Sequence, residues 1–375
     1  MLPSLLTRDI QDGLKQFLTT GFEPSDHHLH GLMTRFVARE NQAQWLKGPY
    51  LQLGLPFRPG AKGRDYFPVF QTEHPGFTHQ ELAWDRLRTG ADRTPGNTLV
   101  ATGTGSGKTE CFVYPVLDHA ARALAAGERG IKALVIYPMN ALATDQARRL
   151  AAMVAATPAF KGLRVGLFVG GMTEPGTGLV MTPTGVITDR DAMRKQPPDI
   201  LLTNYKMLDY LVLRPSDRQL WAKNTPTTLR HLVVDELHTF DGAQGTDLAL
   251  LLRRLRARLK VPANHWLCVG TSATLGNSQD TTALREYARQ FFGSPFAPEA
   301  VVTENRLLVG EFLGDATTDY FLPPRADFGE VLDPARYASP QQAVQAWFGV
   351  FFPDLPCPAW PRWMSHRGGC NWASC

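Results

Sequence analysis

Short apolar runs separated by stretches of helical spacing fill the middle of the chain, from about residue 76 to residue 276. The runs occupy residues 98–101, 133–137, 165–169, 200–202, 231–234 and 266–270. Strands that alternate with helices pair in parallel, in a sheet that helices cover on both faces. In such α/β folds the chemically active residues gather at the carboxyl ends of the strands. The residues that follow each run are therefore where we expect a functional site.

The regions on either side lack this alternation. Residues 1–75 begin with apolar residues at helical spacing, continue with a second candidate helix at 29–38, and end in a Gly- and Pro-rich stretch that predicts a short strand at about 50–55. After residue 276, a helix at 282–292 and a strand-like stretch at 300–309 precede a tail rich in Pro and Trp. We expect an α-rich appendage at 1–75, a parallel α/β domain at 76–310 and an incomplete carboxyl-terminal segment at 311–375.

Composition narrows the class of protein. Hydrophobic residues make up 43% of the chain, which is enough for a packed core and excludes a wholly disordered protein. No run approaches the roughly 20 apolar residues of a membrane span, and the five cysteines are too sparse for a disulfide framework, so we expect a cytoplasmic protein that makes no membrane contact. The net charge of +4 permits a nucleic-acid partner without demanding one.

A glycine-rich loop follows the first apolar run and precedes a helical pattern. Its sequence is Thr102-Gly103-Thr104-Gly105-Ser106-Gly107-Lys108-Thr109, in which Thr102 takes the place of the first glycine of the strict phosphate-loop pattern. In a strand, loop and helix of this kind, backbone N–H groups hold phosphates, Lys108 reaches the outer ones and the Thr109 hydroxyl ligates magnesium. The alternative is an ordinary glycine-rich turn. The strand and helix on either side favour a site for ATP and Mg²⁺.

Two carboxylates follow the run at 231–234. Asp235 is suited to hold magnesium, and Glu236 to orient or deprotonate an attacking water. A solvated acidic turn is the alternative reading of these two residues taken alone. Small hydroxyl side chains after the run at 266–270 have the reach to bond to the cluster of Asp235, Glu236 and His238, although Ser and Thr are also common in turns.

These residues in this order, with Gln80 upstream, resemble the superfamily-two DEAD/DEAH-box helicases. The resemblance implies a RecA-like P-loop NTPase domain, the first of two in that family. It implies catalytic roles for Lys108, Asp235, Glu236 and His238, adenine recognition by Gln80, and coupling of ATP to strand binding by Ser272, Ala273 and Thr274.

The resemblance also extends to three segments, 137–146, 169–171 and 197–205, which look like the family's contacts to the nucleic-acid backbone. It implies that a single strand or duplex, with DNA favoured, lies against Pro138, Asn140, Gly170, Gly171, Thr203 and Asn204. The amino-acid sequences of 137–143 and 203–208 are similar to the corresponding segments of the large Lhr-like and MrfA-like bacterial helicases, including those of phage-defence systems such as DISARM and Druantia.

Nothing after residue 276 resembles the second RecA-like domain, whose arginine completes the family's ATP site. The leading hypothesis is therefore the ATP-binding half of a helicase or translocase, hydrolysing ATP poorly alone and acting with a second RecA-like half or a larger defence complex. The alternative is a non-catalytic, ATP-responsive module that binds nucleic acid or such a complex. DNA versus RNA, polarity and pathway stay open, as does the question whether the chain is a gene fragment.

Two further clusters have competing interpretations. The helix expected at 247–260 carries several arginines around an apolar stripe, which predicts either a solvated basic face or a nucleic-acid contact. His27, His28 and His30 crowd an expected helix start, where we expect no acid or thiol partners and a solvent-facing cluster in preference to a metal site.

Overall fold

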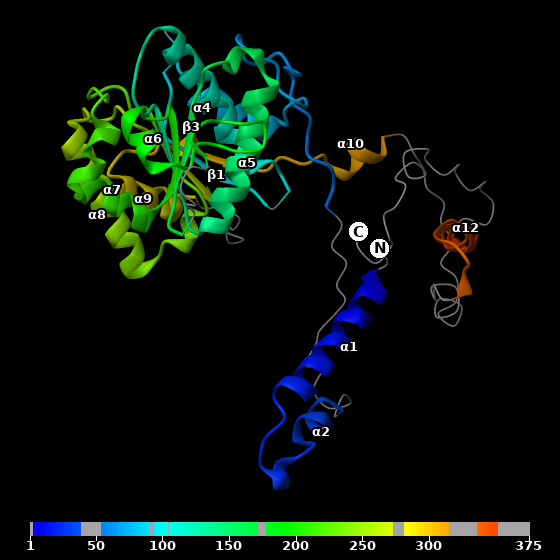
Figure 1. Ribbon diagram of the computed structural model, residues 1–375. Coiled ribbons are helices and arrows are strands. Elements are labelled where there is room, and N and C mark those ends of the chain that lie inside the picture. The colour runs from blue at the N-terminus through cyan, green and yellow to red at the C-terminus, as the bar shows by residue number, and fades with distance from the viewer. Residues whose placement is uncertain are drawn as a thin grey trace. The chain divides into compact units, whose positions relative to one another are not determined.

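The computed structural model describes residues 3–38, 54–90, 94–103, 105–171, 178–272, 281–314 and 336–351 (Figure 1). It divides into a larger unit, Pro56–Leu307, and a smaller unit made of Met1–Leu55 and Leu308–Cys375. None of the helices within these described ranges combines the length and the hydropathy that a membrane span requires.

The larger unit is built on a seven-stranded sheet with the strand order β3-β4-β2-β5-β6-β1-β7. Its strands are β1 (Thr98–Ala101), β2 (Ala133–Tyr137), β3 (Val165–Phe168), β4 (Ile200–Asn204), β5 (His231–Val234), β6 (Leu267–Ser272) and β7 (Val301–Thr303). Neighbouring strands all pair in parallel. The predicted parallel α/β fold is confirmed, and the carboxyl ends of all these strands lie at one edge of the sheet.

Helices and short 3-10 turns join the strands. The helices are α3 (Thr78–Leu87), α4 (Lys108–Ala125), α5 (Asn140–Ala156), α6 (Arg190–Lys195), α7 (Tyr205–Leu213), α8 (Gly242–Leu259) and α9 (Thr282–Phe292). The 3-10 turns are η2 (Pro158–Phe160), η3 (Pro215–Trp221), η4 (Leu237–Thr239) and η5 (Pro298–Ala300).

Alternate strand residues bury into two separate cores, one on each face of the sheet. Leu134 of β2 belongs to the core that α7, α8 and α9 cover, whereas its neighbour Val135 belongs to the core under α4 and α5. Figure 1 shows these two groups of helices on opposite sides of the sheet. A strand buried on both faces has no polar position, which is why the strands read as unbroken apolar runs in the sequence.

The segment before α3 also packs into the larger unit. Phe67 and Phe70 stack on one another with ring centroids 4.8 Å apart, and both contact Tyr114 of α4. The backbone of Phe57 bridges Arg306, next to the end of β7. The compact unit begins at Pro56, and these aromatic side chains complete its core beside α4.

The smaller unit contains α1 (Pro3–Gly21), η1 (His27–Leu29), α2 (Leu32–Ala38), α10 (Val309–Leu313) and α12 (Pro340–Phe351). The two helices expected near the amino terminus correspond to α1 and α2. Most of the short strand expected at 50–55, and the Cys- and Trp-rich tail after residue 351, lie outside the described residues.

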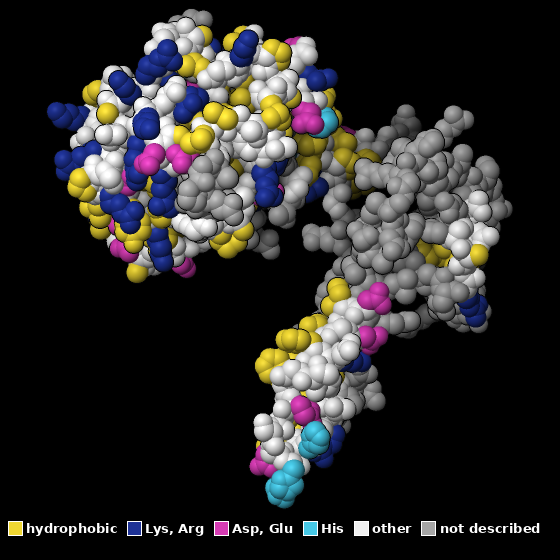
Figure 2. All heavy atoms as spheres, viewed as in Figure 1, with side chains coloured by type: hydrophobic (Ala, Val, Ile, Leu, Met, Phe, Trp, Pro, Cys, Tyr) yellow, Lys and Arg dark blue, Asp and Glu magenta, His cyan; other side chains and the backbone are white. Residues whose placement is uncertain are grey.

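Charged side chains of both signs are dispersed over the visible face of the larger unit (Figure 2). This mixed surface agrees with the near balance of 39 basic and 35 acidic residues in the whole chain.

Two histidines, one buried and one half-buried, lie together at the amino end of β5. His231 is fully buried, its Nε2 lies 3.2 Å from the Leu87 carbonyl oxygen, and its ring centroid is 5.1 Å from that of His119. Burial, reinforced by the positive charge of Arg230, lowers the pKa of His231 to about 4. Burial lowers the pKa of His119 in the same direction.

We predict that this burial makes the folded protein less stable as the pH falls. Above the ordinary histidine pKa of 6.5 both the folded and the unfolded chain keep His231 neutral, whereas between 6.5 and about 4 only the unfolded chain binds the proton. The free energy of unfolding should therefore decrease by on the order of 3 kcal/mol over this window on account of His231 alone. Urea unfolding of His231→Gln should show a flatter pH dependence than the wild type. The exposed His74→Gln variant is the control, and equal pH dependence of His231→Gln and wild type would contradict the prediction.

Candidate ATP and nucleic-acid site

The glycine-rich loop leaves the end of β1 and turns directly into α4. Gly105 and Gly107 have φ values of 79° and 76°, in the left-handed region that favours glycine. A Cβ atom on Gly107 would lie 2.3 Å from Gln80 Nε2, so a side chain there would also displace the Gln80 amide from the loop. The first turn of α4 leaves backbone N–H groups without helical acceptors, which is what a phosphate group requires. Thr104 lies outside the described residues.

Helix α3 holds the loop in place. His79 Nε2 lies 2.8 Å from the Ser106 carbonyl oxygen, and Trp84 Nε1 donates to the Glu110 carbonyl at 2.9 Å. Gln80 donates from Nε2 to the Gly107 carbonyl at 3.1 Å and accepts the Phe77 N–H at Oε1, 2.9 Å away. Gln80, predicted to recognise adenine, is thus buried and bonded to the phosphate loop itself.

A carboxylate from the other end of the unit also contacts the loop. Glu304, just after β7, accepts the Gly103 N–H at 3.0 Å and pairs with Arg306 Nε at 2.9 Å. Arg306, with the Gly103 N–H beside it, lowers the pKa of the Glu304 carboxyl, so the group stays ionised. Sequence reasoning missed Glu304, because only the parallel pairing of β7 with β1 brings it to the loop.

The two predicted carboxylates emerge from β5 beside the loop. Lys108 Nζ lies 3.5 Å from Glu236 Oε1, and the Thr271 hydroxyl donates to Asp235 Oδ1. The same hydroxyl accepts the Glu236 N–H at 2.9 Å. Thr271 therefore fixes both acids, as expected of a hydroxyl side chain that directly follows the apolar run at 266–270.

The chemistry of these side chains fits a divalent cation. Asp235 is only 7% exposed, and burial raises the pKa of its carboxyl in spite of the Thr271 hydrogen bond. A buried carboxylate is stabilised when a cation compensates its charge. Asp235 and the Thr109 hydroxyl, one residue into α4, are the groups that would hold Mg²⁺.

Of the three residues predicted to couple ATP to strand binding, the structure describes Ser272. Ser272 Oγ lies 3.3 Å from His238 Nδ1, which in turn lies 3.3 Å from Glu236 Oε2. Ala273 and Thr274 lie outside the described residues. The end of β6 is thus joined to the acid cluster through His238.

The three segments predicted to contact nucleic acid meet at neighbouring strand ends. Asn204 Nδ2 donates to Asn140 Oδ1 at 2.6 Å, and Asn140 Nδ2 lies 3.5 Å from the Gly170 carbonyl oxygen. Gly171 is exposed beside them, and Pro138 is half-buried. Thr203, in contrast, is fully buried and its hydroxyl donates to the Phe168 carbonyl at 2.7 Å. Its side chain holds β4 to β3 and is not part of the exposed surface.

The arginines of α8 make contacts within the larger unit. Arg253 donates to the Gln290 carbonyl at 2.7 Å and Arg256 to the Gly293 carbonyl at 3.0 Å, both at the end of α9. Arg254 pairs with Asp209, and Arg258 donates to the Val212 carbonyl, both on α7. These bonds tie α8 to its two neighbours, which favours a structural role over direct nucleic-acid contact.

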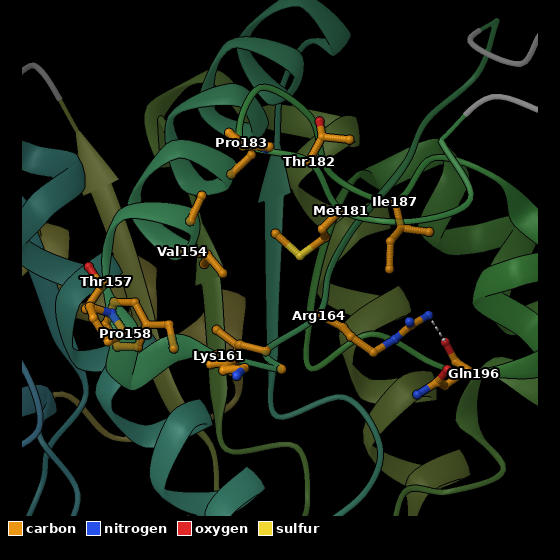
Figure 3. Close-up of a pocket in the computed structure, with 15 residues that line it drawn as sticks. Val154, Thr157, Pro158, Lys161, Arg164, Met181, Thr182, Pro183, Ile187 and Gln196 are labelled. Carbon is orange, nitrogen blue, oxygen red and sulfur yellow. Dashed lines mark hydrogen bonds between the residues drawn. The ribbon is translucent and has the colours of Figure 1, made fainter.

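A cavity of about 590 Å³ lies away from the strand ends, between the end of α5 and the start of β3 (Figure 3). Val154, Met181 and Ile187 supply apolar walls, and Arg164 lines it while donating to the Gln196 carbonyl at 2.9 Å. None of the predicted site residues lines this cavity.

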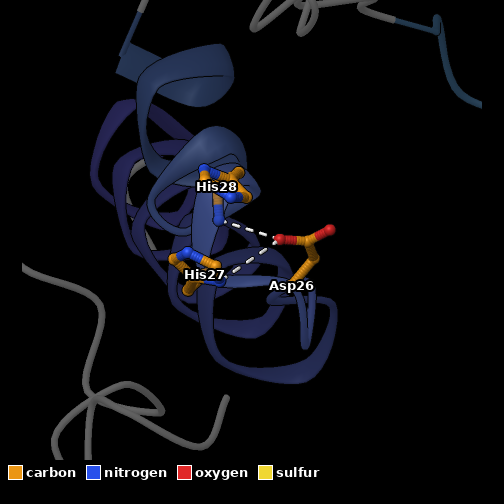
Figure 4. A group of neighbouring side chains, drawn as sticks. All are labelled: Asp26, His27 and His28. Carbon is orange, nitrogen blue, oxygen red and sulfur yellow. Dashed lines mark hydrogen bonds and ion pairs between the residues drawn. The ribbon is translucent and has the colours of Figure 1, made fainter.

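The histidine cluster of the smaller unit is exposed, as expected, and it does have acid neighbours (Figure 4). Asp26 accepts the His28 N–H at 2.9 Å and lies 3.7 Å from His27 Nδ1, while Glu23 lies 2.8 Å from His30 Nδ1. Asp26, His27 and His28 are close enough to share a cation, but Asp26 already caps η1. We assign no metal site to them.

Residues 77–282 match the DEAD/DEAH box helicase family, and the chain belongs to that family. The match covers the phosphate loop, the Asp235-Glu236 pair and the strand ends described above. It confirms the family resemblance found in the sequence.

Curated relatives include the Druantia protein DruE of Escherichia coli (strain UMEA 4076-1), which is 28% identical over 54% of this chain and 16% of its own length. The Lhr helicase/probable uracil glycosylase of Mycolicibacterium smegmatis is 33% identical over 52% of this chain and 12% of its own length. The chain thus spans less than a fifth of the length of either relative. Among solved structures, the DUF1998 helicase MrfA bound to DNA covers 67% of this chain and 29% of its own, with 24% identity and a TM-score of 0.48.

We predict that Thr271 stabilises the acid cluster. Thr271→Val keeps the shape of the side chain but removes both the bond to Asp235 and the acceptor of the Glu236 N–H. Because each lost bond leaves a buried polar group unpaired, the free energy of unfolding should fall by about 2 kcal/mol or more. Thr271→Ser, which keeps the hydroxyl, should stay close to the wild type. Urea unfolding measures both, and a Val variant as stable as the Ser variant would contradict the geometry.

Proposed function

We propose that this chain is the ATP-binding half of an ATP-dependent nucleic-acid helicase or translocase. The observation that carries the proposal is the convergence, at one edge of one parallel sheet, of a phosphate loop, two carboxylates and a row of small polar groups. The first two are the parts of an ATP site, and the third is a surface on which a strand can lie. Membership of the DEAD/DEAH box family supports the same assignment.

In this proposal the loop from Gly103 to Thr109 binds the phosphates of ATP. Lys108 now pairs with Glu236, and in the ATP-bound protein its ammonium would turn to the outer phosphates. Magnesium, held by Asp235 and Thr109, neutralises phosphate charge when bound. Gln80, whose side-chain amide bonds to the Phe77 N–H and the Gly107 carbonyl, is the residue that we propose recognises the adenine.

Glu236 is the group we propose to orient the attacking water. Its Oε2 accepts no hydrogen bond from the residues that the structure describes and lies 3.3 Å from His238 Nδ1, and we propose that it accepts a hydrogen bond from the attacking water. Its backbone φ of +50° is unusual for a residue other than glycine, and the Thr271 hydroxyl and Thr239 N–H hold it there. The strain is consistent with a carboxylate placed for chemistry.

The nucleic acid would lie across the ends of β2, β4 and β3, against Asn140, Asn204, Gly170 and Gly171. Small side chains and backbone groups would contact the phosphates and sugars and leave the bases free, so binding should depend little on the base sequence of the nucleic acid. We take DNA as the first strand to test. A second RecA-like half, on another part of a longer protein or on a partner, would close over this surface.

A second candidate function is a non-catalytic module that binds ATP and signals its presence. One observation favours it: among the described residues, Lys108 is the one permanently charged cation within ion-pair distance of Asp235 or Glu236. Phosphoryl transfer needs more positive charge than a single lysine supplies, and an arginine finger is typically worth about a thousandfold or more in rate.

Phosphate release by the 375-residue chain separates the two candidates. We predict slow turnover that Glu236→Gln reduces at least tenfold, since the substitution keeps the shape but removes the charge that orients water. The exposed Glu299→Gln is a matched control and should leave turnover unchanged. Single-stranded DNA should raise the rate only slightly, because coupling requires a second lobe to close on ATP and strand.

Two other outcomes would count against this account. Wild type and Glu236→Gln with the same background rate would favour the non-catalytic module. Rapid turnover that DNA stimulates strongly, and that Glu236→Gln abolishes, would show that the chain is a complete motor without a second half.

A further inference from the structure

Arg190, which neither the motifs nor the family resemblance singled out, lies at the carboxyl end of β3. It is the first residue of α6, and its Nη2 donates to the Val169 carbonyl at 3.2 Å. Its guanidinium carbon lies 5.1 Å from the centroid of the buried Phe168 ring. These two contacts hold a cation next to Gly170, the glycine at the end of the same strand.

This position extends the row of strand ends. Asn140 follows β2, Asn204 ends β4 and Gly170 follows β3, and these strands are consecutive in the sheet. Since β3 is the edge strand, Arg190 stands at the outer end of the row. A nucleic-acid strand lying across Asn140 and Gly170 would reach Arg190 next.

The row itself carries no side-chain charge: Pro138, Asn140, Gly170, Gly171 and Asn204 are all neutral. Affinity for a nucleic-acid backbone comes largely from cations that neutralise phosphates. Arginine suits this role because its planar group offers several N–H donors to phosphate oxygens. A charge at the end of the row would supply what its other members lack.

The charge of Arg190 is also available. Among the described residues no carboxylate lies within ion-pair distance of Arg190, since Asp189 accepts the Ala192 N–H and Asp191 pairs with Arg194 at 2.7 Å. Arg194, on the same helix, differs in this respect because Asp191 and Asp217 together neutralise it. The guanidinium has five N–H groups, and the Val169 carbonyl accepts one of them.

We propose that Arg190 is a further nucleic-acid-binding residue, which binds a backbone phosphate beyond the edge strand and orients the strand along the row. The inference rests on the proposed function, because it assumes that nucleic acid lies across these strand ends. The competing account is structural: Arg190 would serve only to hold the end of β3 through Val169 and Phe168. The two accounts differ in how binding responds to salt.

The test is fluorescence anisotropy of labelled oligo-dT with the 375-residue chain across a range of salt concentrations. Each phosphate neutralised on a single strand contributes about 0.7 to the slope of log K against log salt. Arg190→Gln should therefore lower that slope by about 0.7 and weaken binding about tenfold at low salt. Lys195→Gln removes one positive charge from the exposed end of the same helix and is the matched control, expected to match the wild type.

Arg190→Lys and thermal melting complete the design. The lysine keeps the charge but not the planar fork, so it should retain the wild-type salt slope with weaker binding. If Arg190→Gln binds like the wild type, or binds more weakly with an unchanged slope and a lower melting temperature, the inference is overturned and the role is structural. If the wild type itself fails to bind oligo-dT, the proposed function fails first.

Discussion

The register between neighbouring parallel strands is the constraint on which the whole site depends. β5 and β6 pair Val234 with Gly270, and β1 and β6 pair Ala101 with Ser272. These pairings bring Asp235 beside Thr271 and the start of the phosphate loop beside both. Because side chains alternate between the two faces of a sheet, a shift of one residue would turn the Thr271 hydroxyl away from Asp235. The apolar cores on both faces fix the register, so the packing that stabilises the fold also sets the chemistry.

The site has a cost that the rest of the unit must offset. Asp235 is buried with a raised pKa, Glu236 adopts a left-handed backbone conformation, and Lys108 pairs with Glu236. ATP and a divalent cation would compensate the buried charge of Asp235 and give the Lys108 ammonium a phosphate partner. A protein built in this way should be more stable with its ligands than without them. The same reasoning gives Thr271 its importance, since it bonds to both acids.

The sequence was most informative where burial is most complete. The runs at 98–101, 133–137 and 231–234 coincide with strands β1, β2 and β5, and the helix expected at 282–292 is α9. Strands buried on both faces leave an unbroken apolar run, and that pattern is local. The order of loop and carboxylates along the chain was also enough to identify the family.

Contacts between distant segments were not readable in the same way. Glu304 lies about 200 residues from Gly103 along the chain, and only the position of β7 beside β1 joins them. The arginines of α8 have a basic pattern in the sequence, yet the structure gives their N–H groups to α7 and α9. Likewise, no sequence pattern marks Arg190, because its position at the end of the row of strand ends depends on β3 being the edge strand. In each case tertiary packing determines the partner, and sequence periodicity reports only local secondary structure.

The central claim is that the strand ends form an ATP site in which Lys108 meets the phosphates. Its most direct measurement is calorimetric titration of Mg·ATP into the wild type, Lys108→Ala and the exposed control Lys223→Ala. A charge-assisted contact to phosphate is worth roughly 1.5 to 3 kcal/mol, so Lys108→Ala should lose at least about tenfold in affinity while the control binds normally. If Lys108→Ala binds Mg·ATP as tightly as the wild type, the loop is not a phosphate site and the account is wrong.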